Sequence, residues 1–509
     1  MIGRFFTVGG LTLLSRLTGF ARDIVLAAVL GAGPTADAFF VALRLPNHFR
    51  AIFAEGAFNA AFVPAYARIR QQEGLPTAQL FSDRVFTLLF ASQVVLLLCA
   101  LAFTPDLIQL LAPGFGKDPG RFALAVELTR ITFPYVLLVS LVTLYGGILN
   151  ALARFAAAAA APILLNLSMI AMLSLSGLFA TAGHAAAWGV LLAGVLELLL
   201  VGGDTLRNGV LAVFRWPRWD EGVKRFFKAL LPATIGSAGL QIALFADTII
   251  ASFLSAGALS ALYYADRLNQ LPIGVIGIAA GTVLLPEMAQ RIATGDEQGA
   301  RHAQARAIEF TLLLSIPCVV AFLLIPDLIM RALFVRGAFT ANDALAAGRT
   351  LAAYAVGLLP FVLLRSMTAT FLARGDTATP VKASLIAVAV NVAFKIVLMA
   401  PLAQVGLALA TSIGAWLNFG LVAWFAARQG HLAMDARLRG NVIRLTIAGI
   451  ALTLALWLAD VALARLWPSG TAPHDLGRLG ALAAVGVVVY GGGLLVLFGR
   501  KWRQHLARG

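Results

Sequence analysis

Charged side chains are scarce in this sequence: Asp, Glu, Lys and Arg make up only 12% of its 509 residues, against about 25% in soluble domains. This scarcity excludes a soluble protein with a large core, and hydrophobic residues make up 60% of the chain. Aromatic residues are also few, at 9%, and the apolar runs are long and continuous. A membrane β-barrel would show short alternating segments instead. The sequence therefore predicts an all-α polytopic membrane protein.

Residues for metal binding and catalysis are equally sparse. The two cysteines, Cys99 and Cys318, lie inside apolar runs and provide neither a disulfide framework nor metal-ligand spacing. The six histidines are scattered, so no metal site is predicted. The sequence contains no P-loop, no Rossmann glycine pattern and no nucleophile elbow. We therefore expect a protein that is not an enzyme, has no cofactor, and uses a membrane potential or an ion gradient.

Basic residues give the chain a formal net charge of +15. Most of them lie at the ends of apolar runs and in alternate short loops, which disfavours nucleic acid as a partner. Loops rich in Lys and Arg stay on the cytoplasmic side of a membrane. The pattern predicts that both termini are cytoplasmic.

Apolar segments of spanning length, about 20 residues each, predict about fourteen transmembrane helices. Their approximate ranges are 5–31, 35–66, 85–112, 122–152, 159–181, 185–206, 229–256, 259–290, 307–334, 344–373, 379–400, 403–427, 442–466 and 476–499. In the interval 207–228, Trp and Phe residues are interleaved with basic residues. That composition predicts an amphipathic cytoplasmic linker on the membrane surface.

The two halves of the chain carry an internal repeat. Phe20-Ala21 matches Phe245-Ala246 at an offset of 225, and Pro105-Asp106 matches Pro326-Asp327 at an offset of 221. The offset falls slowly along the chain, as small differences in loop length would produce. Each copy holds six spans, an even number, so both copies have the same orientation. We expect two pseudo-symmetric six-helix lobes around a central cavity, plus two additional C-terminal helices.

The repeat and the basic intervals divide the chain into four parts. The predicted parts are an N-terminal lobe (1–206), the amphipathic linker (207–228), a C-terminal lobe (229–427), and the last two helices with a basic cytoplasmic tail (428–509).

The first 55 residues keep several charges inside apolar helices. An Arg at the centre of a membrane helix costs about 2.5–3.5 kcal/mol on insertion scales. Such residues are either structural ion pairs or a site for an anion, because Arg binds phosphate and carboxylate groups bidentately; both interpretations stay open. The candidate substrate-binding residues of this stretch are Arg16, Arg22 and Arg50, and the second half keeps Arg267 at the position that aligns with Arg44. The candidate gating or charge-pair residues are Asp23, Asp37, Glu55 and Asp266. Of these, Asp37 and Glu55 would pair with arginines in one state and release them in another.

Helical geometry limits this site. Arg16 and Arg22 lie about 120° apart around an ideal helix, so both reach one cavity only if the helix bends, which Gly19 permits. The second half has Asp247 at the position equivalent to Arg22, and Asp247, Asn391 and Lys395 form a candidate ion-coupling group. A structural ion pair is the alternative interpretation. A lysine beside a carboxylate disfavours sodium as the coupling ion.

Several stretches resemble the MurJ/MviN family of lipid II flippases, within the multidrug/oligosaccharidyl-lipid/polysaccharide exporter superfamily. They are LLSRLTGFARD (13–23), GAGPTADAFFVALRLPNHFRAIFAEGAFNAAFVP (31–64), PGF (113–115), TFPYVLLVSL (132–141), YYADRL (263–268) and GTVLLPEMA (281–289). The resemblance covers the first twelve spans and, more loosely, the last two. Family arginines considered essential match Arg16, Arg22, Arg50 and Arg267, and an acidic family position matches Asp37. Ala51 departs from relatives that carry a second Arg there, and Lys395 departs from relatives thought to hold sodium near Asp247 and Asn391.

The resemblance implies a function in peptidoglycan biosynthesis, cell wall biogenesis and cell shape. The chain would move lipid II, the undecaprenyl-pyrophosphate-linked precursor, from the cytoplasmic to the periplasmic leaflet of the bacterial inner membrane by alternating access. The last two helices would border a groove for the undecaprenyl tail. Expected partners are lipid II, bilayer lipids and other peptidoglycan-synthesis proteins. The alternatives are another exporter of the superfamily, for a polysaccharide lipid or a drug, and a membrane-embedded enzyme or scaffold.

Overall fold

A computed structural model describes residues 2–50, 56–216, 218–432, 435–466 and 472–499. Every regular element in these ranges is helical, and none of them forms a strand. This agrees with the all-α fold that the continuous apolar runs predict, because a backbone in lipid must satisfy its own hydrogen bonds.

The helices group into two compact units. The first unit comprises Met1–Gly257 together with Gly337–Phe339, and the second comprises Ala258–Arg336 and Thr340–Gly509. The helices of the first unit are α1 (Ile2–Leu30), α2 (Pro34–Arg50), α3 (Gly56–Glu73), α4 (Leu75–Ala102), α5 (Thr104–Leu111), η2 (Pro113–Lys117), α6 (Pro119–Thr132), α7 (Tyr135–Ala151), α8 (Ala156–Ser174), η3 (Ser176–Leu178), α9 (Ala182–Arg207) and α10 (Glu221–Ser252). The helices of the second unit are α11 (Ala258–Pro272), η4 (Ile273–Gly277), α12 (Ile278–Ala293), α13 (Glu297–Leu324), α14 (Pro326–Phe334), α15 (Ala341–Ala355), α16 (Leu358–Leu372), α17 (Ala378–Arg428), α18 (Ala436–Leu466) and α19 (Ala472–Phe498).

The described part of the chain contains nine helical stretches long and apolar enough to cross a membrane. One of them, α17, contains Pro401 and has a non-helical residue at Ala403, with φ 48° and ψ −128°. The break divides α17 near the boundary between the predicted spans 379–400 and 403–427. The total of fourteen spans stays a prediction.

The order of elements repeats along the chain. A 28-residue helix, α4, precedes the short α5, and a 28-residue helix, α13, precedes the short α14. Pro lies in the first turn of both short helices, where its missing N–H is not needed. In each half, two helices separated by a brief interruption follow: α6 and α7 in the first, α15 and α16 in the second.

Helix α10 packs with the first unit, although most of it belongs to the second copy of the sequence repeat. Its residues from 229 onward belong to the predicted C-terminal lobe, yet α10 packs on α3 in the first unit. Phe226, near the start of α10, contributes to this contact: its ring packs edge to face against Phe58 and Phe62 of α3 and Phe81 of α4, with centroids 5.6 to 6.1 Å apart. The predicted lobe boundaries stay a prediction.

The predicted linker 207–228 is only partly a linker. Helix α9 ends at Arg207, and α10 already begins at Glu221, where the side chain of Asp220 accepts a hydrogen bond from the Val223 N–H at 2.7 Å. The second part of the linker is therefore the first two turns of α10, and the described residues between the two helices form no helix.

The turn between α1 and α2 is fixed by residues 337–339, which is why these belong to the first unit. The Ala338 N–H donates to the Ala28 carbonyl at 2.7 Å. Gly31 has a φ of +66°, and a Cβ there would lie 2.6 Å from the Ala338 carbonyl oxygen. Only glycine fits this position, because both the conformation and the contact exclude a side chain.

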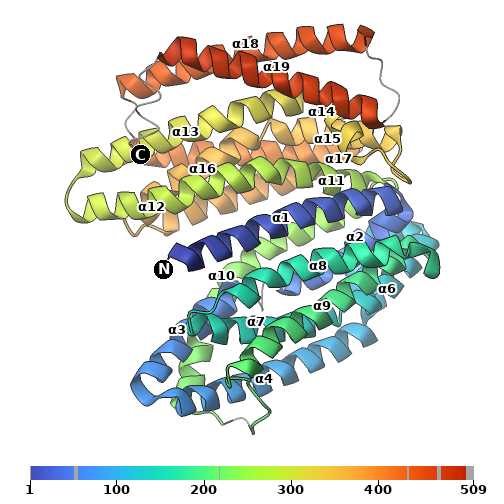
Figure 1. Ribbon diagram of the computed structural model, residues 1–509, viewed down its shortest axis with the longest axis vertical. Coiled ribbons are helices and arrows are strands. Elements are labelled where there is room, and N and C mark those ends of the chain that lie inside the picture. Colours follow the sequence, from blue (N-terminus) through green and yellow to red (C-terminus); the bar gives the residue numbers. More distant parts are fainter. Residues whose placement is uncertain (1, 51–55, 217, 433–434, 467–471, 500–509) are drawn as a thin grey trace. The chain divides into compact units, whose positions relative to one another are not determined.

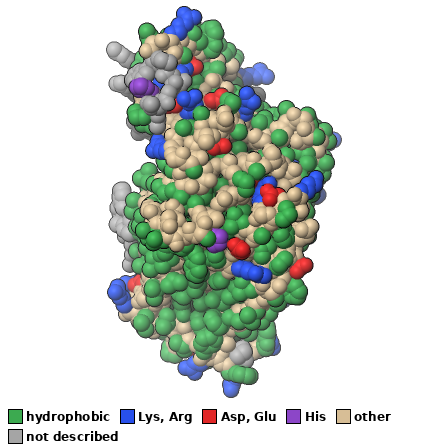
Figure 2. All heavy atoms as spheres, turned by 90° about the vertical axis from the view of Figure 1, so that its right-hand side faces the viewer, with side chains coloured by type: hydrophobic (Ala, Val, Ile, Leu, Met, Phe, Trp, Pro, Cys, Tyr) green, Lys and Arg blue, Asp and Glu red, His purple; other side chains and the backbone are tan. Residues whose placement is uncertain are grey.

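Large hydrophobic side chains cover much of the surface. Figure 2 shows continuous hydrophobic areas on one face, with Lys and Arg in separate spots. In the second unit α18 and α19 lie side by side (Figure 1), and Val487 and Val496 of α19 are 74% and 84% exposed. Such exposure is expected of side chains that face lipid rather than water.

Candidate anion-binding site

Arg22 lies in the interior of α1 and is held by two neighbours. Its Nε and Nη2 both donate to Oδ1 of Asp23, at 3.0 and 2.7 Å, and its Nη1 donates to Oδ1 of Asn166 on α8 at 3.0 Å. The side chains of Arg22 and Asp23 are only 12% and 6% exposed. A guanidinium ion is thus fixed in place in an apolar helix, with its charge partly balanced by the adjacent carboxylate.

Asn166 also fixes the distance between α1 and α8. Its Nδ2 donates to the Ser15 carbonyl at 3.0 Å and to the Thr18 hydroxyl at 3.1 Å. Gly19 lies opposite this amide, and a Cβ there would be 3.4 Å from Asn166 Nδ2. A small residue at Gly19 brings the two helices close enough for Asn166 to bind both α1 and Arg22.

The structure places Arg16 and Arg22 in different surroundings. Helix α1 continues through Gly19 without a break, and the Arg16 side chain is exposed whereas Arg22 is mostly buried. Directing both arginines into one cavity requires a bend at Gly19, and the helix has no break there. A shared cavity for Arg16 and Arg22 stays a prediction.

Arg50, at the end of α2, contacts a second set of buried groups. It lies next to the Tyr135 side chain and interacts electrostatically with the Glu197 carboxylate. The Tyr135 hydroxyl also donates to Glu197 Oε2 at 3.4 Å. Both partners are almost fully buried. Arg50 therefore resembles Arg22 in having one carboxylate and one neutral polar group as neighbours.

Asp37 is fully buried and pairs with an arginine outside the candidate site. Arg121 Nη2 lies 3.3 Å from Asp37 Oδ2, and the Gly257 N–H donates to the same oxygen at 2.8 Å. The guanidinium of Arg121 also lies over the Phe115 ring, 3.7 Å from its centroid. The gating hypothesis expected site arginines as partners, whereas the described ion pair of Asp37 joins α2 to α6.

The candidate residues of the second half are divided between the units. Asp247 is a half-buried residue of α10 in the first unit, whereas Asn391 and Lys395 belong to α17 in the second. Lys395 is buried, and Asn391 packs against Gly414, where a Cβ would lie 2.9 Å from the Asn391 Cβ. The predicted coupling group stays a prediction.

Two further candidates lie on α11. The guanidinium of Arg267 lies over the Tyr263 ring, 4.7 Å from its centroid, and Asp266 accepts a hydrogen bond from Gln270. Both Arg267 and Asp266 are half-buried. Glu55 lies outside the described residues.

Four residues that contact the candidate residues were not among the predicted set: Tyr135, Asn166, Glu197 and Arg121. A polar residue inside a membrane helix is a recognisable signal of function or of helix contact. Asn166 and Glu197 gave that signal, but their partners are distant in the sequence and could not be inferred. No group of three or more His, Cys, Asp or Glu residues is placed to hold a metal ion within the described ranges.

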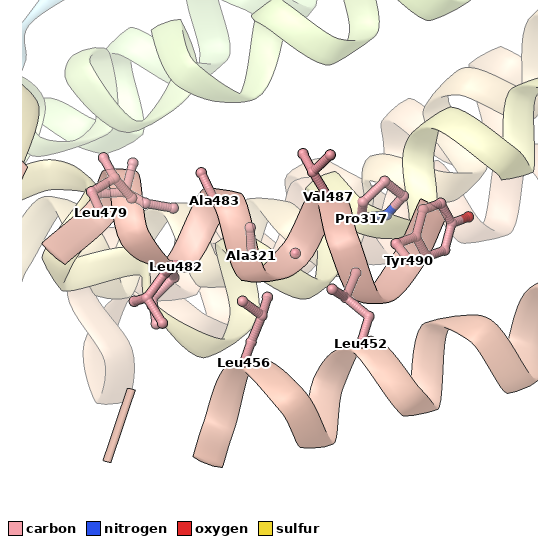
Figure 3. Close-up of a pocket in the computed structure, with 12 residues that line it drawn as sticks. Pro317, Ala321, Leu452, Leu456, Leu479, Leu482, Ala483, Val487 and Tyr490 are labelled. Atoms are coloured by element: carbon pink, nitrogen blue, oxygen red, sulfur yellow. The ribbon is translucent and has the colours of Figure 1, made fainter. Parts of the chain in front are cut away.

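An apolar cavity of about 270 Å³ lies beside the last two helices. Figure 3 shows Leu479, Leu482, Ala483 and Val487 of α19 in this pocket, with residues of α13 and α18 opposite them. Tyr490 lines the pocket too, and its hydroxyl is satisfied by the Leu313 carbonyl at 2.9 Å. The cavity can therefore accept a hydrocarbon group but offers little to a polar one.

Comparison with known proteins identifies the family. A family model described as lipid II flippase MurJ matches residues 26–473. A probable lipid II flippase MurJ of Rhizobium meliloti (strain 1021) is 43% identical over 464 residues, covering 90% of this chain and 86% of that protein. A lipid II flippase MurJ of Burkholderia cenocepacia is 33% identical over 511 residues, covering 97% and 96%. The chain therefore belongs to the MurJ family.

Solved structures support the fold. A lipid II flippase MurJ in an inward closed conformation matches with a TM-score of 0.80 at 23% identity, covering 98% of this chain and 99% of that one. An inward-facing multidrug resistance transporter of the MATE family, in the MOP superfamily, matches with a TM-score of 0.67 at 17% identity, covering 83% and 97%. The predicted class of polytopic helical membrane protein is confirmed.

Proposed function

We propose that this member of the MurJ family moves lipid II from the cytoplasmic to the periplasmic leaflet by alternating access. The observation that carries the proposal is the fixed guanidinium of Arg22, held in the interior of α1 by Asp23 and Asn166. An arginine that is already ordered loses little side-chain entropy on binding, and its planar donors match the oxygens of a pyrophosphate. The chain belongs to the lipid II flippase family MurJ, which indicates lipid II as the substrate, and lipid II contains such a pyrophosphate.

Arg50 supports the same assignment. It is a second arginine of the first unit next to a buried carboxylate, Glu197, and a buried phenol, Tyr135. Two cationic groups in one unit would bind a doubly charged head group better than one would. Arg16 and Arg267 are the remaining proposed ligands.

The apolar cavity between α13, α18 and α19 would receive part of the undecaprenyl chain. Its lining is aliphatic apart from Tyr490. A hydrocarbon tail gains about 0.8 kcal/mol for each CH₂ group moved from water, but gains little when it comes from lipid. The cavity would therefore guide the tail rather than supply most of the affinity.

We propose a membrane potential or an ion gradient as the energy source. Sodium is disfavoured, because the buried Lys395 would bring a positive charge to any cation site near Asn391. The proposed location is the inner membrane, with both termini cytoplasmic and other peptidoglycan-synthesis proteins as further partners.

The test is transport of fluorescent lipid II in reconstituted vesicles. We expect Arg22→Ala to slow flipping about 10- to 100-fold, because the variant loses one or more hydrogen bonds to a charged group. Arg22→Lys keeps the charge but loses the fork of donors, and is expected to recover only part of the rate. Arg439→Ala, at an exposed arginine of α18, is the control. Unchanged flipping in Arg22→Ala would remove this residue from the mechanism.

The same vesicles identify the energy source. A membrane potential, a proton gradient and a sodium gradient are imposed one at a time, and the flipping rate is compared with that in vesicles without a gradient. We expect acceleration by the potential or the proton gradient. Acceleration by sodium alone would contradict the argument from Lys395.

A further inference from the structure

The connection between α9 and α10 has a defined conformation although its described residues form no helix. Three polar side chains of α4 bind its backbone in succession. The hydrogen bonds are Gln79 Nε2 to the Leu211 carbonyl (2.8 Å), the Val213 N–H to Asp83 Oδ1 (3.0 Å) and the Arg215 N–H to Thr87 Oγ1 (3.0 Å). The three side chains are four residues apart and lie on one face of α4. The connection therefore runs along α4 in the same direction as that helix, from Gln79 toward Thr87.

Asp83 is the centre of this attachment. It is only 2% exposed, and Arg215 Nε lies 3.4 Å from its second oxygen. Closer to the C-terminal end of α4, the Phe214 ring packs edge to face on Phe86 and Phe90, with centroids 5.1 and 4.9 Å away. The connection then returns, and Asp220 forms an ion pair with Arg84.

The turning point of the connection lies where α4 becomes apolar. From Gln79 to Thr87 the helix rises about 12 Å. Arg84 is the last charged residue of α4, and Leu88, Leu89 and Phe90 follow Thr87. Since α4 is long and apolar enough to cross a membrane, this change in composition is where the boundary between water and the apolar interior is expected.

Aromatic side chains point outward at this level. Trp216 is 87% exposed, Trp219 is 60% exposed and Phe214 is 63% exposed. Tryptophan prefers the head-group region of a bilayer, because its ring is apolar while its N–H needs a polar partner. Exposure of two tryptophans to water alone would be unfavourable.

The charges around these rings are mostly positive. The acidic residues of the segment are neutralised, Asp220 by Arg84 and Glu221 by Arg225. Three exposed cations have no ion pair among the described residues: Arg218, Lys224 and Lys228. A phospholipid presents a phosphate group, which these cations can bind, next to acyl chains, which the tryptophan rings can contact.

We propose that residues 209–216 and 218–228, which we call the interfacial segment, bind the head groups of anionic phospholipids at the membrane surface. Asp83 fixes the segment to α4, Trp216 and Trp219 enter the head-group layer, and Arg218, Lys224 and Lys228 bind lipid phosphate. A basic residue near an anionic membrane surface contributes about 1 kcal/mol, which is about a five-fold preference for the anionic lipid. This proposal does not depend on which substrate the protein moves.

The first experiment measures the depth of the segment. A nitroxide is placed by Trp216→Cys in a Cys99→Ala, Cys318→Ala background, in vesicles of phosphatidylglycerol and phosphatidylethanolamine. We expect the label to be relaxed more by oxygen than by a water-soluble nickel chelate. The control, Gln72→Cys at the exposed end of α3, is expected to show the reverse. A Trp216→Cys label as accessible to the chelate as the control overturns the proposal and favours a protein partner.

The second experiment measures lipid selectivity by counting lipids retained on the purified protein in native mass spectrometry. The triple variant Arg218→Gln, Lys224→Gln, Lys228→Gln is expected to lower the preference for phosphatidylglycerol over phosphatidylcholine by up to about 100-fold. The matched control neutralises Lys382, Arg437 and Arg439, three exposed cations of the second unit. An equal loss in the control, or no loss in either variant, overturns the proposal.

Discussion

Two buried ion pairs of the first unit contain the same chemical groups but differ in how they are built. Arg22 and Asp23 are adjacent on α1, 2.7 Å apart, with side chains 12% and 6% exposed. Arg121 and Asp37 lie on different helices, 3.3 Å apart, with side chains 5% and 0% exposed. The first pair can open by a side-chain rotation. The second joins α2 to α6, so opening it removes a contact between two helices.

This difference separates a binding group from a structural one. Arg22 keeps its partner next to it in the sequence, so a phosphate can replace the carboxylate without moving a helix. Arg121 contacts Asp37 and the ring of Phe115, and Asp37 also accepts a hydrogen bond from the Gly257 N–H. We infer that Arg22 is available for exchange with an anion, whereas Arg121 stabilises the fold.

The largest expected effect is on stability, from breaking the pair between helices. Arg121→Met should lower the free energy of unfolding by about 3–5 kcal/mol, because the buried Asp37 carboxylate loses the Arg121 guanidinium. Thermal unfolding in detergent measures this loss. The double variant Arg121→Met, Asp37→Leu should recover part of it, since no buried charge remains. If Arg121→Met has the same unfolding temperature as the parent protein but does not transport lipid II, then the Arg121–Asp37 pair has a role in transport, and the distinction between it and the Arg22–Asp23 pair is wrong.

The second effect concerns the residue that holds Arg22. Asn166→Leu removes the acceptor for Arg22 Nη1 and the donor to Ser15 and Thr18. We expect a loss of about 1–3 kcal/mol in stability, the cost of leaving buried polar groups unsatisfied, and a lower affinity for lipid II. Ser168→Ala, at a buried serine on the same helix, is the control. Equal loss of affinity in both variants would argue against a positioning role for Asn166.

The helical fold was predictable because lipid leaves the backbone few alternatives. The repeat of Pro105-Asp106 in Pro326-Asp327 likewise predicted two copies of one element order, which the short helices α5 and α14 reproduce. The helix starts were less predictable. Helices α4 and α13 begin at Leu75 and Glu297, ten residues before their apolar runs at 85 and 307. Hydrophobicity reports the thickness of the apolar layer, and a helix can continue beyond it into water.

The partners within the site were not predictable from the sequence. Arg22 and Asn166 are 144 residues apart, so their contact depends on how α1 packs against α8. Arg121 follows a loop, and its sequence neighbourhood gave no sign that it pairs with the buried Asp37. Residue types identified the candidate arginines, but tertiary packing decided which carboxylate each one meets.

A smaller effect is expected at the second arginine. Glu197→Gln removes the negative charge near Arg50 but keeps a group that can accept from the Tyr135 hydroxyl. If Arg50 binds the substrate, loss of its competing carboxylate should leave affinity for lipid II unchanged or raise it by a few-fold. Equilibrium binding in nanodiscs measures the change, with Glu197→Ala as the variant that also loses the hydrogen bond. A strong loss of affinity in Glu197→Gln would place Arg50 with the structural pairs.

The smallest effect is expected at Gly19, where it separates two models of α1. A Cβ at this position meets Asn166 Nδ2 at 3.4 Å, an ordinary contact, so the rigid helix accepts Gly19→Ala. Alanine favours a helix interior over glycine by roughly 0.5–1 kcal/mol, and we expect the variant to unfold at a slightly higher temperature. If α1 stays straight during transport, flipping of lipid II in vesicles is unchanged. If a bend at Gly19 must bring Arg16 and Arg22 to one head group, flipping falls although stability rises, and only this second outcome connects the two arginines in one site.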